Sequence, residues 1–144
     1  MRNLLATEKW KEADKETDNC MLKVVRREKK GWLRVEDIDD FPGEDLDTIN
    51  KLWVKYSNAK FGFSVQKQIY QTLGGTRQYN SKIWEAFAEE VGWRKASKWL
   101  GYSDLNFNLK ICRYKGHLPA AVALNKWSRF AMGYLFYRPE ICRL

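Results

Sequence analysis

The sequence predicts an all-α fold, and three observations support this prediction. Apolar residues recur at the three- and four-residue spacing of amphipathic helices in several segments. No segment shows a convincing alternation of apolar and polar residues, which would indicate a half-buried strand. Capping residues, glycines and prolines stand where the helical segments begin and end. With 144 residues the chain can bury a core, and we expect one compact multi-helix domain over residues 1–144.

The first helical pattern runs from Leu4 to Val24 and predicts one amphipathic helix or a close pair of helices. The charged run from Arg26 to Lys30 follows, and we interpret it as a solvated connector that could also contact an anionic partner. A turn at residues 41–43 leads into a second helix, which carries apolar positions as far as Tyr56. Acidic residues fill the first turn of this helix, where the helix dipole favours negative charge.

The segment from Phe61 to Gln66 reads Phe-Gly-Phe-Ser-Val-Gln and forms a corner before the next helix. We predict that this helix runs from Val65 to Leu73, with Ser64 as its N-cap and two glycines after its end. The two aromatic residues that flank the glycine could pack in the core or face a ligand. Taken alone they favour packing, since most buried aromatic rings only pack.

Ser81 can cap a further helix, which Gly92 ends. From residue 93 to residue 119 the periodicity is lost while aromatic residues stay frequent, and we expect no more than a short helical turn at residues 94–98. A long irregular segment is usually functional or disordered, and this one is too aromatic for disorder. We therefore interpret it as a binding loop, followed by a final helix from Ala120 to Tyr137.

The composition limits the kinds of partner that the protein could bind and indicates where in the cell it could be found. The chain has 26 Lys and Arg against 18 Asp and Glu, a net charge of +8, which favours an anionic small molecule, a nucleic acid or an acidic protein surface. The start of the chain lacks the apolar core of a signal peptide, and no apolar run approaches the roughly 20 residues of a membrane span. We therefore expect a soluble cytoplasmic protein.

Motifs of catalysis and metal binding are missing from the sequence, so we do not expect an enzyme. There is no Gly-rich phosphate loop, no H-E-x-x-H and no nucleophile elbow. The 3 Cys have no metal-ligand spacing, which predicts free thiols and no metal site. The one histidine, His117, is better explained by a ring hydrogen-bonded to the backbone than by catalysis. Cys112 is a candidate covalent or redox site, because Lys110 and Arg113 nearby could lower its thiol pKa.

What remains is a set of aromatic and cationic residues at the corner, in the binding loop and on the final helix. Flat apolar rings beside positive charge suit a planar, acidic ligand. In such a site, the aromatic side chains would set the affinity and the cationic side chains would orient the ligand. The set comprises Phe61, Phe63, Trp99, Tyr102 and Phe107 with the cations Lys126 and Arg129. The same composition could stack single-stranded nucleic acid, but no nucleic-acid-binding module is recognised and we do not expect that partner.

Motifs along nearly the whole chain carry a resemblance to a known family. They are Trp10 to Asp14, Phe41-Pro42, Leu52-Trp53-Val54, Phe61 to Gln66, Gly92-Trp93 and Gly116-His117-Leu118-Pro119. In this order they resemble the genomes-uncoupled-four-like tetrapyrrole-binding family. The resemblance implies an all-α fold whose loops and helix ends form a groove for protoporphyrin IX or Mg-protoporphyrin IX. It also implies a non-enzymatic regulator or activator of magnesium chelatase in chlorophyll biosynthesis, with a chelatase subunit as its partner.

The resemblance also implies which residues contact the ligand. These are Phe61, Phe63, Val65, Ile69, Trp99, Tyr102, Leu105, Phe107, Leu118, Lys126 and Arg129. The loop at residues 110–115 is longer and more basic than in the chelatase activators of this family, which leaves the choice of tetrapyrrole open. The alternative is a bilin- or porphyrin-sensing regulatory protein that acts on another partner. The chain begins at the porphyrin-binding core, so it could be a stand-alone ligand sensor rather than the partner of the chelatase. With this resemblance we also expect a monomer that associates at most peripherally with a photosynthetic membrane.

Overall fold

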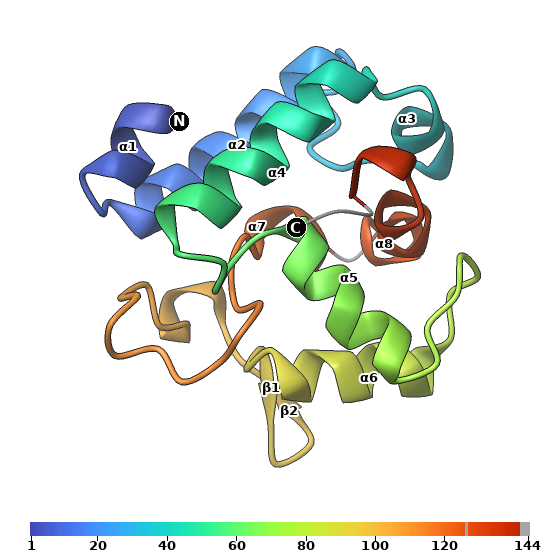
Figure 1. Cartoon of the computed structure of the whole chain (residues 1–144). Helices are drawn as coiled ribbons and strands as arrows, with labels where there is room; N and C mark the ends of the chain where they lie inside the picture. Colours follow the sequence, from blue (N-terminus) through green and yellow to red (C-terminus); the bar gives the residue numbers. More distant parts are fainter. Residues whose placement is uncertain (126, 142–144) are drawn as a thin grey trace.

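The computed structural model describes residues 1–125 and 127–141 and confirms the predicted all-α class (Figure 1). Most of the described residues are helical, and the strands are limited to one two-residue pair. The elements are α1 (Arg2–Ala6), α2 (Trp10–Val24), α3 (Val35–Asp39), α4 (Gly43–Tyr56), α5 (Phe63–Thr72), α6 (Ser81–Glu90), β1 (Arg94–Lys95), β2 (Lys98–Trp99), η1 (Tyr102–Asp104), α7 (Ala121–Leu124), α8 (Arg129–Phe136) and η2 (Pro139–Ile141).

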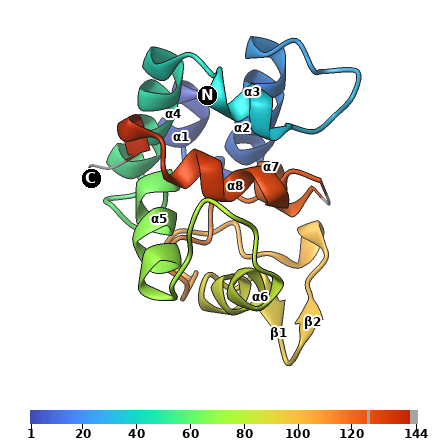
Figure 2. The same ribbon diagram turned by 90° about the vertical axis from the view of Figure 1, so that its right-hand side faces the viewer.

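The helices form two groups with α7 and α8 between them (Figure 2). On one side lie α1 to α4, and on the other lie α5, α6 and the β1–β2 hairpin. Helix α7 packs against α2, and α8 packs against α3 and α5. The irregular segment between the hairpin and α7 therefore runs along the boundary between the two groups, where loops and helix ends meet.

Aromatic side chains form much of the core between these helices. The ring of Trp10 in α2 lies 6.1 Å from that of Trp53 in α4 and 5.8 Å from that of Phe61. Trp53 is fully buried, and its indole N–H donates a hydrogen bond of 2.9 Å to the hydroxyl of Thr17. These contacts join α2, α4 and the corner before α5.

The corner before α5 differs from the prediction in its cap and its start. Helix α5 begins at Phe63, two residues earlier than predicted, and Gly62 with φ +126° is its N-cap. Ser64 lies inside the first turn, where the Asn50 side-chain oxygen accepts from its backbone N–H at 3.0 Å and from its hydroxyl at 3.2 Å. The predicted cap was therefore wrong, because a side chain from α4 takes over the capping of this helix.

Two further predictions of local structure were wrong. Asn80, not Ser81, caps α6, since its side-chain oxygen accepts from the Ile83 N–H. Residues 94–98 form most of a hairpin instead of a helical turn, with Arg94 paired to Trp99. Its two-residue turn, Ala96-Ser97, has φ of 50° and 65°, as tight hairpins require, but it lacks the glycine or asparagine that usually signals such a turn.

The final helix is also interrupted. A single helix was predicted from Ala120 to Tyr137, whereas the structure has the short helix α7 and then α8 from Arg129. The backbone of Asn125 is extended, which ends α7. Because of this break, Arg129 stands at the start of a separate helix and not within one continuous helix.

Candidate functional site

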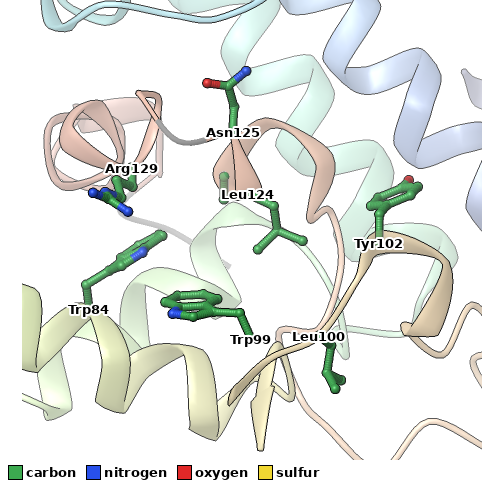
Figure 3. Close-up of a pocket in the computed structure, with 8 residues that line it drawn as sticks. Trp84, Trp99, Leu100, Tyr102, Leu124, Asn125 and Arg129 are labelled. Atoms are coloured by element: carbon green, nitrogen blue, oxygen red, sulfur yellow. The ribbon is translucent and has the colours of Figure 1, made fainter. Parts of the chain in front are cut away.

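A pocket of about 330 Å³ opens at this boundary (Figure 3). Five elements or their flanks contribute to its wall: α6, β2, η1, α7 and α8. Its lining residues are Trp84, Trp99, Leu100, Tyr102, Ala123, Leu124, Asn125 and Arg129. The indole rings of Trp84 and Trp99 lie on one side, with Arg129 close by and Tyr102 across from them. Trp99 is 43% exposed, so a large apolar ring is available to a ligand.

A second hollow of about 360 Å³ adjoins this pocket along α7. The two share Tyr102, Leu124 and Asn125 in their linings, and α2 adds Lys15 and Asp18 to the second. Small-molecule sites commonly occupy about 300 to 1,000 Å³, so the first pocket alone is at the small end of that range. A ligand larger than the first pocket would extend over the shared residues into the second hollow.

Arg129 is the cation of the pocket, and its charge is not neutralised by a partner in the described part of the chain. Its guanidinium lies over the rings of Tyr79 and Phe130, at 5.6 Å and 5.1 Å from their centroids. Its Nε is buried but donates no hydrogen bond to any of the described residues. A buried donor without an acceptor is unfavourable, and guanidinium groups bind carboxylates in two-point geometry. The pocket therefore offers a place for an acidic group.

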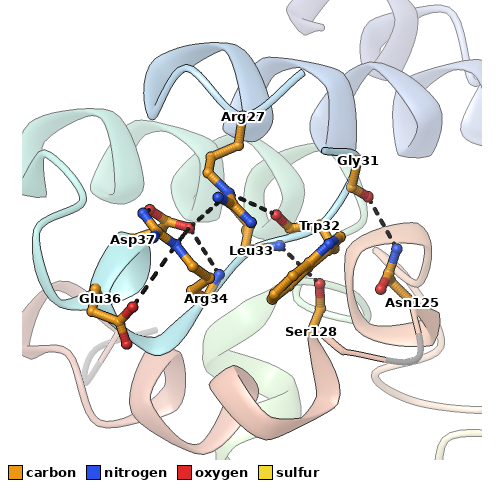
Figure 4. A network of polar contacts seen from close by, with 9 residues as sticks. All are labelled: Arg27, Gly31, Trp32, Leu33, Arg34, Glu36, Asp37, Asn125 and Ser128. Carbon is orange, nitrogen blue, oxygen red and sulfur yellow. Dashed lines mark hydrogen bonds and ion pairs between the residues drawn. The ribbon is translucent and has the colours of Figure 1, made fainter. Parts of the chain in front are cut away.

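The connection between α7 and α8 is fixed from the segment before α3 (Figure 4). The amide of Asn125 donates to the Gly31 carbonyl at 3.0 Å, and its oxygen accepts from the Trp127 N–H at 3.0 Å. The hydroxyl of Ser128, which is buried, accepts from the Leu33 N–H at 3.2 Å. These bonds hold the chain on both sides of residue 126 and so position Asn125 and Arg129 at the pocket.

The segment before α3 is itself held by a cluster of three charged side chains, Arg27, Arg34 and Asp37. Arg27 pairs with Asp37 at 3.2 Å, and Arg34 binds both carboxylate oxygens of Asp37, at 2.9 Å and 3.1 Å. Burial acts to raise the pKa of Asp37, but the hydrogen bonds and charges of the two arginines outweigh it and keep that pKa below its usual value. The guanidinium of Arg27 also lies 4.8 Å from the centroid of Trp32, next to the segment that binds Asn125.

The structure brings together only some of the residues predicted to contact the ligand. Trp99, Tyr102 and Arg129 line the pocket, whereas Ile69 and Phe107 are half-buried outside it. Lys126 lies outside the described residues. Five others belong to the core and line neither hollow; they are Phe61, Phe63, Val65, Leu105 and Leu118. Packing is the role that this structure gives them, and their contact with a ligand stays a prediction.

Several lining residues were not predicted as site residues. Trp84 lies within the helix predicted between Ser81 and Gly92 and was not singled out there; its large aromatic ring was the available signal. Leu124 and Asn125 were placed inside one continuous final helix. No signal in the sequence indicated that the helix stops there, because the bonds that fix Asn125 come from residue 31, far away in the chain.

His117 is held by the backbone, as the sequence predicted. Its Nδ1–H donates to the Val91 carbonyl at 2.6 Å, and its Nε2 accepts from the Asn106 N–H at 3.1 Å. Its own carbonyl accepts from the indole N–H of Trp93 at 2.7 Å. The ring is buried and does not line the pocket. It therefore fixes the loop before α7.

We expect the pKa of the His117 imidazole to lie below about 6.5, the ordinary value for histidine. Burial lowers its pKa, and the charges of Lys95 and Lys60 lower it further. A lowered pKa means that the unfolded chain takes up this proton first, so stability decreases as pH falls below about 6.5. Because the sequence has 1 His, NMR of the labelled imidazole in a pH titration measures this pKa directly. A pKa above 6.5 would contradict the bonding described for the ring.

Cys112 does not have the environment of a reactive thiol. It is 3% exposed, and burial raises its pKa despite the hydrogen bond to Tyr114 and the charges of Lys60 and Lys95. The predicted lowering of its pKa was wrong, because burial outweighs the basic neighbours. Cys20 and Cys112 are free thiols, and Cys142 lies outside the described residues.

The described residues contain no group of three or more His, Cys, Asp or Glu arranged to hold a metal ion. Among the helices of residues 1–125 and 127–141, none has the length and apolar character needed to cross a bilayer.

Comparisons with known proteins place these features in a family. Residues 1–134 match the family described as GUN4-like. The chain is 38% identical over 109 residues to the ycf53 protein of Porphyra purpurea, which covers 74% of this chain and 42% of that protein. It is 28% identical over 97 residues to the chloroplastic tetrapyrrole-binding protein of Arabidopsis thaliana, covering 66% of this chain and 34% of that one. The chain thus spans about half or less of the length of these curated relatives.

The fold matches a solved structure as well. The ligand-free structure of Arabidopsis thaliana GUN4 superposes with a TM-score of 0.80 at 24% identity, covering 97% of this chain and 91% of that one. At this identity the likeness concerns the fold alone. The family match covers most of the sequence, including the helices and the loop that form the pocket. The chain therefore belongs to the GUN4-like family.

Proposed function

We propose that the protein binds a tetrapyrrole in the pocket between Trp99, Tyr102 and Arg129, and that the ligand is protoporphyrin IX or Mg-protoporphyrin IX. The observation that carries the proposal is an aromatic pocket with a guanidinium that has no acidic partner among the described residues, in a chain of the GUN4-like family. A planar macrocycle with acidic side chains meets both features, since its face can pack on the indole rings while a carboxylate reaches Arg129. The name of the Arabidopsis relative, a tetrapyrrole-binding protein, supports the same ligand class.

Ring packing supplies most of the binding free energy in this proposal. Burying about 400 Å² of apolar surface at about 25 cal/mol per Å² contributes roughly 10 kcal/mol before the cost of association is subtracted. A hydrogen bond to a charged group contributes about 1.5 to 3 kcal/mol, and a fully solvated ion pair about 0.2 to 1 kcal/mol. Arg129 therefore orients the macrocycle and selects for its acidic side chains, while the exposed ring of Trp99 supplies the main packing surface.

The donor atoms near the pocket favour the metal-free or magnesium form over haem. Haem iron is usually held by imidazole, thiolate or thioether ligands, whereas magnesium prefers oxygen. The pocket lining among the described residues includes no His, Cys or Met. Both ring nitrogens of His117 are already hydrogen-bonded. A haem-binding protein would be expected to provide a side chain that coordinates the iron, whereas binding of metal-free protoporphyrin requires no such side chain.

Titration of protoporphyrin IX into the protein tests the proposal. We expect saturable quenching of tryptophan fluorescence and a shifted Soret band at micromolar ligand, because Trp99 would lie against the macrocycle and Trp84 lies close behind it. Trp99→Ala is expected to weaken binding about tenfold, since it removes a large ring from the contact area. A panel with Mg-protoporphyrin IX, haem and a bilin ranks the ligands by dissociation constant.

Ile111→Ala is the matched control for Trp99→Ala. Ile111 is 66% exposed and lies outside both hollows, so the loss of its side chain should leave binding unchanged. Absence of quenching and of a Soret shift for the unaltered protein would overturn the proposal. Equal affinities of the Trp99→Ala variant and the unaltered protein would place the ligand elsewhere on the molecule.

We further propose that the ligand-bound protein regulates or activates magnesium chelatase in chlorophyll biosynthesis and does not itself catalyse a reaction. The resemblance of its motifs to those of the chelatase activators supports this role. An assay of magnesium insertion by chelatase, with and without the protein, tests it. A rate unchanged by the protein would leave the alternative, a tetrapyrrole or bilin sensor that acts on another partner.

A further inference from the structure

Asp14 is a fully buried carboxylate next to the pocket. It lies in α2 and is 0% exposed. Its Oδ2 accepts from the hydroxyl of Tyr102 at 2.6 Å, and its Oδ1 accepts from the N–H of Ala120 at 2.8 Å. The N–H of Ala121 lies within 3.3 Å of Oδ1 and 3.2 Å of Oδ2. Burying a charge is unfavourable unless it is hydrogen-bonded, and here three donors surround the carboxylate.

The partners of Asp14 belong to two different elements of the pocket wall. Tyr102, in η1, lines the pocket itself. Ala120 and Ala121 start α7, the helix that carries Leu124 and leads to Asn125 on another wall. Asp14 does not line the pocket. One side chain from α2 thus ties η1 to the start of α7, and any effect it has on a ligand passes through Tyr102 and α7.

The surroundings of Asp14 also set its charge. Burial raises its pKa to about 6, the hydrogen bonds from Tyr102 and from the two backbone N–H groups act against this rise, and the charge of Asp18 adds to it. Among the described residues, the titratable groups that act on Asp14 are Tyr102 from η1 and Asp18 from the next turn of α2, while α7 contributes backbone N–H groups.

Protonation changes the bonds that Asp14 can make. The carboxylate only accepts, so the Tyr102 hydroxyl donates to it in a short, charge-assisted bond. A protonated Oδ2 becomes a donor, and the tyrosine hydroxyl must turn to accept. Charge-assisted hydrogen bonds are about twice as strong as neutral ones, so protonation loosens the tie to Tyr102. Because the pKa is raised, the folded protein takes up this proton as pH falls through about 6.

We propose that Asp14 is a positioning residue of the tetrapyrrole site, which acts through Tyr102 and the start of α7 and weakens tetrapyrrole binding when it is protonated. The inference rests on the proposed function. It adds that affinity for the ligand depends on pH through a group that never touches the ligand. In the cell, the protein would hold its tetrapyrrole more tightly in a neutral or alkaline compartment than in an acidified one.

The test compares dissociation constants of protoporphyrin IX between about pH 8 and about pH 5 for the unaltered protein and Asp14→Asn. The ligand's own carboxylates titrate too, but they affect both proteins equally and cancel in the ratio of the two constants. Asp14→Asn keeps the shape and cannot ionise. We expect the unaltered protein to bind about three- to tenfold more tightly than the variant at pH 8, and the difference to disappear near pH 5.

Two further variants sharpen the result. Asp45→Asn removes the same charge from an exposed position in α4, so its profile should parallel that of the unaltered protein. Tyr102→Phe removes the hydroxyl that Asp14 binds, and its effect should not add fully to that of Asp14→Asn, because the first removes and the second weakens the same bond. If Asp14→Asn fails to fold by circular dichroism, Tyr102→Phe makes the same test alone.

The outcomes separate this inference from the proposed function. A ratio of dissociation constants that stays the same from pH 8 to pH 5, for Asp14→Asn or in its place for Tyr102→Phe, overturns the role of Asp14 while leaving tetrapyrrole binding intact. Failure of the unaltered protein to bind protoporphyrin IX at any pH overturns the proposed function instead. Effects of Asp14→Asn and Tyr102→Phe that add fully would show that Asp14 does not act through Tyr102.

Discussion

Arg129→Gln is expected to weaken the binding of protoporphyrin IX by about tenfold to a hundredfold. The guanidinium lines the pocket and has no acidic partner among the described residues, so an acidic side chain of the ligand would gain a hydrogen bond to a charged group. Such a bond contributes about 1.5 to 3 kcal/mol, and each 1.4 kcal/mol changes a dissociation constant tenfold. Fluorescence titration of the variant and of the unaltered protein measures the difference.

The dimethyl ester of protoporphyrin IX makes the test specific to the carboxylates. If Arg129 binds a carboxylate, the ester should bind the unaltered protein more weakly than the free acid by a similar factor, and Arg129→Gln should bind both alike. Arg113→Gln is the matched control, because Arg113 is exposed and lies outside the pocket. Equal affinity of Arg129→Gln and the unaltered protein for the free acid would exclude this residue as the acid-binding group.

Gly62→Ala is expected to lower the free energy of unfolding by about 2 to 4 kcal/mol. Gly62 has φ +126°, where a residue with a Cβ is strained. A Cβ there would lie 2.8 Å from Cγ2 of Val54 and 3.3 Å from the side-chain oxygen of Asn50. That oxygen binds Ser64 at the start of α5, so the clash would also disturb the cap of the helix. Urea unfolding followed by circular dichroism measures the loss.

Gly31→Ala is the control that separates backbone strain at positive φ from the steric clash of the added Cβ. Gly31 also has a positive φ, +77°, but a Cβ added there meets nothing within 4 Å. Its substitution should lower stability by only about 1 kcal/mol. If Gly62→Ala lowers the free energy of unfolding no more than Gly31→Ala does, the corner must relax around the added carbon. The close approach of α4 to Gly62 would then not be needed for stability.

The helices with strong periodicity were predictable, and the irregular parts were not. Helix α4 was expected to follow the turn at residues 41–43 and to reach Tyr56, and the structure has it from Gly43 to Tyr56. The hairpin at residues 94–99 was missed, because Ala96 and Ser97 adopt positive φ without the residues that usually signal it. Its strands are two residues long, too short for an alternating pattern to be visible.

In the candidate site, too, some features could be predicted from the sequence and others could not. Trp99, Tyr102 and Arg129 were predicted from residue type and from the resemblance, and they line one pocket. The corner at Phe61 and Phe63 was predicted as part of the same site, yet both rings are fully buried. The aromatic rings of Trp10 and Trp53, from two other helices, pack against Phe61 and leave it in the core.

The sequence by itself determined the family, the all-α class and the chemistry available to the site, because periodicity, caps and residue types are local properties. The tertiary structure decided which aromatic rings face a ligand and where the final helix stops. The bond from Asn125 to Gly31 and the ties from Asp14 to Tyr102 and α7 join residues 88 to 107 positions apart. A periodic pattern shows which face of a helix is apolar, but only packing shows whether another helix or a pocket lies against that face.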